Sequence, residues 1–201
     1  MQKRMQMIQN QTKQNIECKA LLLEDHFTDN RNSWEEVDTA KEYAGIQKGK
    51  YIMENRDDWS WKYYAVNCPM KRYDNFEIHV QLKVENIREM GQTGLVWGFD
   101  KNREVLNRFS ISADFKRFSI LHFEKNHRRV YHRFSQKTRT NQEEALTLSI
   151  TKEDSYLFFK INKENVYICH EAHFCNEGPG FGYYIEPGLK ISSNFIEIRQ
   201  I

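Results

Sequence analysis

The stretch "DNFEIHVQLKVEN", residues 74–86, shows the clearest alternation of apolar and polar side chains in the sequence. Its apolar members occupy every second position: Phe76, Ile78, Val80, Leu82 and Val84. Because successive side chains of a strand point to opposite faces, this period of two predicts a half-buried antiparallel strand. We expect these apolar residues to face the core, and the polar residues between them to face away from it.

Shorter segments of similar character follow along the chain, among them "SWKYYAV", "TGLVWGFD", "NRFSIS", "RFSILHF", "ALTLSIT", "SYLFFKIN" and "GFGYYIE". They are rich in residues that favour strands, and polar turns such as "NRDD", "TKED" and "NKEN" separate them. Connectors this short predict hairpins rather than helical crossovers. The pattern therefore predicts an all-β fold, a two-sheet antiparallel β-sandwich over residues 21–201, preceded by a helical or disordered leader over residues 1–20.

Composition narrows the classes of function. A chain of 201 residues can bury a sizeable core, so it needs neither a structural metal nor a disulfide framework. Its 30 Lys and Arg residues nearly balance its 28 Asp and Glu residues, which makes nucleic acid an unfavoured partner. The four cysteines are irregularly spaced, as in proteins with free thiols. Without a membrane-spanning run or a signal-peptide pattern, we predict no membrane association and a cytoplasmic location, provided that no leader has been removed.

A series of motifs resembles one family in the order in which they occur: "EDHFTDNRNSW", "IQKGKYIMEN", "YDNFEIHVQLK", "GQTGLVWGFD", "NRFSISADFKRFSILHFEKN", "ALTLSITKEDSYLFFKINKENVYI" and "GPGFGYYIEPGLKISSNFIEI". They resemble the concanavalin A-like (LamG-like) lectin and glucanase jelly-roll domains, in particular the small bacterial modules. The resemblance runs from about Leu21 to Ile201. It implies a jelly-roll sandwich but says little about function, because this fold hosts lectins, hydrolases and interaction modules.

The glucanases of that family carry acidic residues at alternate positions of one strand, which places them on one sheet face for glycoside hydrolysis. No strand of this sequence has that pattern. The neighbouring acidic pairs fall in predicted turns instead: Asp57 and Asp58, Glu143 and Glu144, Glu153 and Asp154. We therefore assign no catalytic residues, and the sequence favours a protein that is not an enzyme.

The segment "CHEAHFC" contains four residues that can bind a metal: Cys169, His170, His173 and Cys175. All four lie within seven residues, whereas zinc fingers join two ligand pairs that are far apart in sequence. In a strand, the adjacent Cys169 and His170 would also point to opposite faces. We therefore predict a strand end followed by a loop, with no metal and no cofactor; a metal site is the less favoured alternative.

The most basic stretch, "KNHRRVYHRFSQKTR", covers residues 125–139 and interleaves cations with Val130, Tyr131 and Phe134. Such a stretch can bind an anionic partner, or it can solvate an exposed sheet edge and discourage aggregation. The near-neutral charge of the whole chain favours the exposed edge.

Four tryptophans and the outward positions of two strands supply the candidate ligand-binding residues. Trp34 and Trp97 match family positions that fill the core, whereas Trp59 and Trp61 follow an acidic turn and either stack on sugar rings or cover the edge of the sandwich. If the apolar residues of "EIHVQL" and "NRFSIS" face the core, four polar residues face away: His79, Gln81, Arg108 and Ser110. We expect these two strands to lie close together and to form one polar strip.

The resulting hypothesis is a non-catalytic binding module, with a carbohydrate as the ligand, held on a concave sheet face or by rim loops. The alternative is an intracellular protein-interaction or regulatory module, which the missing signal peptide favours. A glycoside-acting enzyme without the usual paired-acid strand comes third. The sequence leaves the identity of the ligand and the oligomeric state open.

Overall fold

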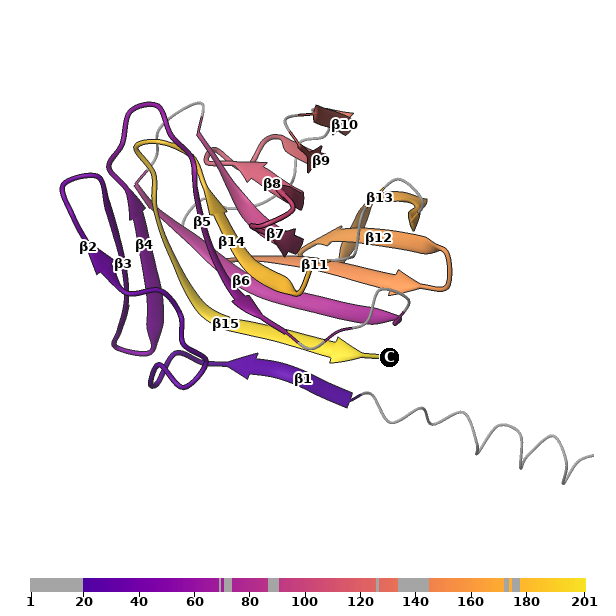
Figure 1. Ribbon diagram of the computed structural model, residues 1–201, viewed down its shortest axis with the longest axis horizontal. Coiled ribbons are helices and arrows are strands. Elements are labelled where there is room, and N and C mark those ends of the chain that lie inside the picture. The colour runs from indigo at the N-terminus through magenta and orange to yellow at the C-terminus, as the bar shows by residue number, and fades with distance from the viewer. Residues whose placement is uncertain are drawn as a thin grey trace, which may run out of the picture.

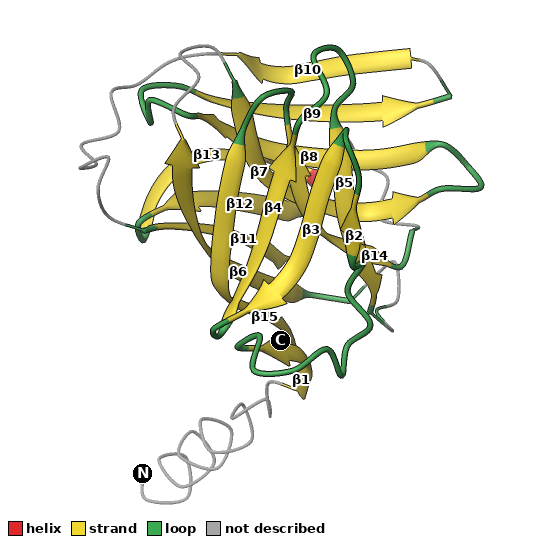
Figure 2. Ribbon diagram, turned by 90° about the vertical axis from the view of Figure 1, so that its left-hand side faces the viewer, coloured by secondary structure: helices red, strands yellow, loops and turns green. Residues whose placement is uncertain are grey.

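The computed structural model describes residues 20–68, 70, 74–86, 91–125, 127–133, 145–171, 174 and 178–201. Strands account for nearly all of their regular structure (Figure 2). Within these ranges, no helix is both long enough and apolar enough to cross a membrane. The predicted leader lies outside the described residues, apart from Ala20, which begins the first strand.

The strands form two antiparallel sheets, which we call sheet A and sheet B. Sheet A has nine strands, in the order β13 (Glu164–His170), β12 (Tyr156–Ile161), β11 (Leu146–Glu153), β6 (Phe76–Asn86), β15 (Lys190–Gln200), β4 (Lys50–Asn55), β3 (Glu42–Gln47) and β2 (Val37–Asp38), with β1 (Ala20–Asp25) also paired to β15. Sheet B has six strands, in the order β10 (His127–Arg133), β9 (Phe118–Glu124), β8 (Val105–Ser112), β7 (Gln92–Asp100), β14 (Gly180–Ile185) and β5 (Lys62–Asn67).

The two sheets pack face to face as a β-sandwich, which confirms the predicted fold class. Sheet A runs from β2–β4, past β15 and β6, to β12 and β13, and curves around sheet B (Figure 1). β1 and the C-terminal end of the chain lie side by side, in agreement with the β1–β15 pairing (Figure 2).

β6 has the alternation predicted for it, and all five of its apolar residues are buried between the sheets. Side chains of both sheets fill this core, including Trp34 and Trp97, as expected. Trp34 donates a hydrogen bond from Nε1 to Asp25 Oδ2 (2.8 Å), so its one polar group has a partner in the interior. Trp97 packs against Phe159 and Phe174, with ring centroids 5.7 and 5.5 Å apart.

Two stretches singled out in the sequence lie at sheet edges. Cys169 and His170 end β13, an edge strand of sheet A, as predicted, while His173 and Cys175 lie outside the described residues. Among the described residues, no three His, Cys, Asp or Glu side chains are grouped to hold a metal. The basic stretch contributes β10, the edge strand of sheet B that pairs with β9, and its exposed residues include Arg129 and Val130. This position agrees with the edge interpretation of the charges.

Candidate functional site

The predicted polar strip is divided between the two sheets. His79 and Gln81 belong to β6 of sheet A, whereas Arg108 and Ser110 belong to β8 of sheet B. Both pairs point away from the core, as the alternation predicted, but they lie on opposite outer faces of the sandwich. The expectation that these strands are neighbours is therefore wrong: β6 lies between β11 and β15, and β8 lies between β7 and β9.

On the outer face of sheet A, the predicted residues have polar neighbours. His79 Nδ1 lies 2.9 Å from Ser149 Oγ, and its Nε2 lies 3.8 Å from Glu77 Oε2. Gln81 and Lys83 of β6 line a hollow of about 50 Å³ together with Lys50 of β4, Ala145, and Ser192 and Asn194 of β15. This face is polar and shallow, and the hollow has room for little more than a water molecule.

The outer face of sheet B is apolar and aromatic. Val96, Leu106 and Tyr184 form a buried cluster there, although all three point away from the main core. Arg108 is 3% exposed, and its guanidinium lies 4.0 Å from the centre of the Tyr184 ring and 5.8 Å from that of Phe123. A planar guanidinium at this distance gains cation–π stabilisation, so Arg108 is a packed component of this face.

Polar groups on this face bond to one another. The hydroxyls of Ser110 and Ser119 lie 2.8 Å apart, and each donates to Gln92 Oε1 at 2.9–3.0 Å. Glu186 accepts from the Tyr184 hydroxyl (2.7 Å) and from the backbone N–H of Gln92 (2.9 Å). Ser110 is fully buried, so its hydroxyl is engaged in this network.

The outer face of sheet B is strongly concave. Trp61 immediately precedes β5 and Phe123 lies on β9, with three strands between them, yet their ring centroids are 5.9 Å apart. In a flat sheet, strands four places apart are separated by about 19 Å. Two outward glycines permit this curvature, because a Cβ at Gly94 would overlap the Phe109 carbonyl and a Cβ at Gly182 would overlap that of Tyr64.

The loop from β4 to β5 presents two tryptophans at the rim of this concave face. Trp59 is 90% exposed and Trp61 is 48% exposed. Asp57 Oδ1 accepts from the backbone N–H groups of Trp59 (2.9 Å) and Ser60 (3.3 Å), and the first of these bonds is the main reason that the pKa of Asp57 is lowered.

The buried Asn55 anchors this loop to the sandwich. Its Nδ2 donates to the carbonyls of Ser60 (2.7 Å) and Ile185 (3.4 Å), and its Oδ1 accepts from the N–H of Asp57 (3.1 Å). The exposed indole of Trp59 is therefore carried by an ordered backbone, which lowers the entropy that a ligand would have to remove on binding.

The outer side of sheet B carries groups that can contact a ligand. Aromatic rings, an arginine, hydroxyls, an amide and the carboxylate of Glu186 line the outer side of sheet B. In its described strands, the outward positions carry no Asp or Glu, so these strands do not supply the carboxylate pair that glycoside hydrolysis requires.

No protein-family model matches the sequence, and neither does any curated protein. Solved structures do match, over nearly the whole chain. The match to a carbohydrate-binding module of Bacillus subtilis spans 91% of this chain and 97% of the module, with 15% identity and a TM-score of 0.52. A B. subtilis protein of unknown function with a galectin-like fold covers 90% over 96% of its own, with 11% identity and a TM-score of 0.64.

A β-1,3-1,4-glucanase (lichenase) from a mouse hindgut metagenome covers 89% of this chain over 99% of its own, with 11% identity and a TM-score of 0.63. The fold is a concanavalin A-like jelly roll. This agrees with the resemblance seen in the sequence motifs, and at these identities the similarity shows the fold alone.

Sequence reasoning missed most of the aromatic residues that line the concave face. Tyr63 packs on Tyr184 and Phe99, with centroids 5.6 and 5.8 Å away, and none of these residues was singled out. A signal was present: "KYYAV" and "GFGYYIE" place a tyrosine on both sides of the strand. Aromatic residues at adjacent strand positions indicate that both faces are covered.

Proposed function

We propose that the protein is a carbohydrate-binding module whose ligand stacks on Trp59 and Trp61. The observation that carries this proposal is a nearly fully exposed Trp59 on a loop held by hydrogen bonds that the Asn55 amide donates and the Asp57 carboxylate accepts. An indole offers a flat apolar face to the C–H side of a sugar ring. Leaving it in water is unfavourable without a ligand, because a large apolar surface stays hydrated.

The rim, rather than the centre of sheet B, is the favoured part of this surface. Val96 and Tyr184 are fully buried and Arg108 nearly so, which leaves little side-chain surface for a ligand between the strands. Trp61 reaches across this face to Phe123 and keeps half of its own surface exposed. A ligand on the rim would therefore meet Trp59 and the free side of Trp61.

The fold supports the choice of ligand class. Similar structures include a carbohydrate-binding module and two enzymes named for glucan substrates, a laminarinase and a lichenase. Pockets of this type combine aromatic surface with a few polar groups that fix the orientation of the ligand.

A glycan array with the purified chain tests the proposal, followed by titration of the best-binding glycan against Trp59→Ala and Trp61→Ala. We expect Trp59→Ala to weaken binding about fivefold, since stacking on a solvent-exposed ring contributes on the order of 1 kcal/mol. The midpoint of thermal unfolding should not change. The matched control is Tyr156→Ala, which removes a 51% exposed aromatic side chain from β12 and should leave affinity unchanged. Equal affinity of wild type and both tryptophan variants would place the site elsewhere.

A protein-interaction module remains the second candidate. Tryptophan is over-represented at the energetic centres of protein interfaces, and Trp59 is 90% exposed. Two results together would favour this function over the first. No glycan on the array would bind, and a purified partner protein would bind the wild type but not Trp59→Ala.

A further inference from the structure

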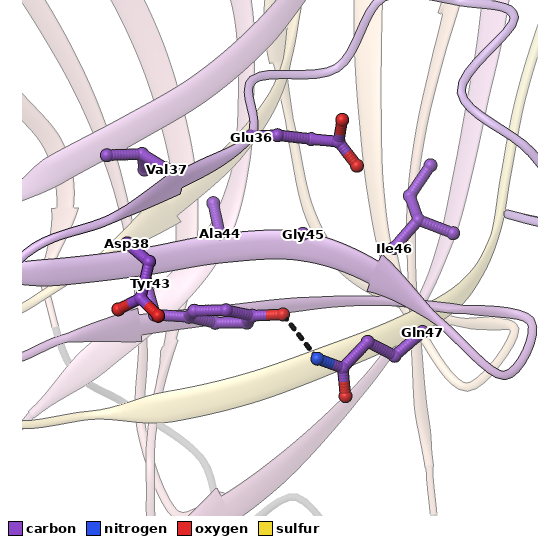
Figure 3. Close-up of a pocket in the computed structure, with 8 residues that line it drawn as sticks. All are labelled: Glu36, Val37, Asp38, Tyr43, Ala44, Gly45, Ile46 and Gln47. Atoms are coloured by element: carbon purple, nitrogen blue, oxygen red, sulfur yellow. Dashed lines mark hydrogen bonds between the residues drawn. The ribbon is translucent and has the colours of Figure 1, made fainter.

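A second surface with binding chemistry lies at the opposite edge of sheet A from β13. β2 has only two residues, and they pair with Tyr43 and Ala44 of β3. Where β2 begins, an open hollow of about 320 Å³ lies between residues 36–38 and residues 43–47 (Figure 3). This volume is at the lower end of the range for small-molecule sites.

One aromatic ring in this hollow lies flat along its own strand. The Tyr43 ring extends over Gly45, where a side chain of any other residue would begin only 2.8 Å from the Tyr43 hydroxyl. Gln47 Nε2 donates a hydrogen bond of 2.6 Å to that hydroxyl and fixes the far end of the ring (Figure 3). The glycine and the glutamine together keep an aromatic face parallel to the sheet, as stacking on a sugar ring requires.

The groups around this ring are polar and partly acidic. The carboxylate of Glu36 projects beside the hollow, and the carboxylate of Asp38 lies near Tyr43 (Figure 3). The guanidinium of Arg56 lies over the Tyr43 ring, with Cζ 5.7 Å from the ring centre. It is held there because its Nη1 donates to Asp38 Oδ1 (2.9 Å) and its Nη2 to Glu54 Oε2 (3.2 Å). Carboxylate and amide oxygens accept hydrogen bonds from sugar hydroxyls, and the carboxylates disfavour a ligand that carries negative charge.

We propose that this hollow is a second glycan-binding site, which takes a single hexose unit without negative charge and prefers an amino sugar. Tyr43 is the stacking platform, Gly45 and Gln47 position it, and Glu36 supplies the charge preference. The site stands on its own geometry and does not depend on ligand binding at Trp59. A chain with two such sites could hold one polymer at two points and gain avidity.

Titration of the isotope-labelled full chain with glucosamine, glucose and glucuronate, followed by amide NMR shifts, tests the proposal. The three sugars share a ring and differ in charge. We expect shifts centred on residues 43–47, with glucosamine binding about fivefold more tightly than glucuronate at low salt and the difference shrinking as salt is added.

Two variants distinguish the contribution of the Tyr43 ring itself from that of its position on the strand. Tyr43→Ala should weaken glucosamine binding about tenfold. Gly45→Ala keeps the ring but displaces its hydroxyl from the strand, so it should weaken binding several-fold without unfolding the sheet. The control, Tyr156→Ala on β12, should leave these shifts unchanged.

The proposal is overturned if no sugar shifts residues 43–47, if glucuronate binds most tightly, or if Tyr43→Ala and Gly45→Ala both bind like wild type. Shifts confined to the loop of Trp59 would overturn this site while supporting the site proposed at the rim. Shifts at residues 43–47 without any shift in the loop of Trp59 would support this site and overturn the site proposed at the rim.

Discussion

The outer faces of the two sheets are built from the same alternating pattern, yet their side chains differ in exposure to solvent. On β6 of sheet A, the outward His79 and Gln81 are partly exposed beside other polar groups. On β8 of sheet B, the outward Arg108 and Ser110 are buried. The difference follows from curvature: sheet B curls toward its outer side, so side chains from distant strands meet there and exclude water. A side chain that points away from the core is therefore exposed to solvent only where the outer face of its sheet is not strongly concave.

The largest effect should come from breaking this curvature. In Gly94→Ala the new methyl group would overlap the backbone of β8 near Phe109, and backbone cannot move as cheaply as a side chain. We expect a loss of about 3 kcal/mol in the free energy of unfolding, measured by urea denaturation. The control is Gln81→Ala on sheet A, which should stay within about 0.5 kcal/mol of wild type. Similar stability of the two variants would contradict the strong curvature of sheet B.

Removing the buried cation should have the next largest effect. Arg108→Ala deletes the guanidinium that packs on Tyr184, and we expect it to lower the free energy of unfolding by roughly 2 kcal/mol. Arg108→Lys should recover only part of this loss, because an ammonium group lacks the planar surface that stacks on the ring. A variant as stable as wild type would instead agree with a solvent-facing ligand contact at this position.

The pH dependence of stability at alkaline pH should report on the burial of Tyr63, which lies on the same face. Burial, aided by Glu186 and opposed by Arg108, raises the pKa of Tyr63 to about 12. In the unfolded chain the phenol ionises near pH 10, so ionisation favours unfolding and stability falls as the pH rises from about 10 to 12. Tyr63→Phe removes this loss, and the fall in stability from pH 8 to pH 11 should be about 1 kcal/mol smaller than in wild type. Equal pH dependence in urea melts of the two proteins would show that Tyr63 ionises as readily when folded.

The smallest effect should come from the open face of sheet A. His79→Ala removes one side-chain contact with Ser149 at a partly exposed position, so we expect a change of at most about 1 kcal/mol. The measurement is the same urea melt at pH 7. A loss as large as that of Arg108→Ala would mean that the two outer faces are equally closed.

Part of the candidate surface was visible in the sequence. The spacing and acidic context of Trp59 and Trp61 left two alternatives, stacking on a ligand or covering an edge, and the structure shows Trp59 almost fully exposed. The hollow at Tyr43 was not predicted. It depends on where a two-residue strand begins and on a tyrosine lying over a glycine two positions away, and neither is marked by periodicity.

The sequence by itself determined which side of each strand faces the core. Alternation in β6 placed Val80 inward and His79 outward, and in β8 it placed Phe109 inward and Arg108 outward. This information is local, because side-chain direction in a strand depends only on the parity of the position. The alternation predicted a two-sheet sandwich, and the resemblance of the motifs to the concanavalin A-like domains implied the jelly roll.

Only the tertiary structure decided which strands share a sheet and how far each sheet bends. Pairing joins β6 to β15, more than 100 residues later in the chain, as in the contact of His79 with Glu197. Curvature depends on glycines of one strand meeting the backbone of the next, as Gly182 meets Tyr64. Both are properties of contacts between segments distant in sequence, so no pattern within a single strand contains them.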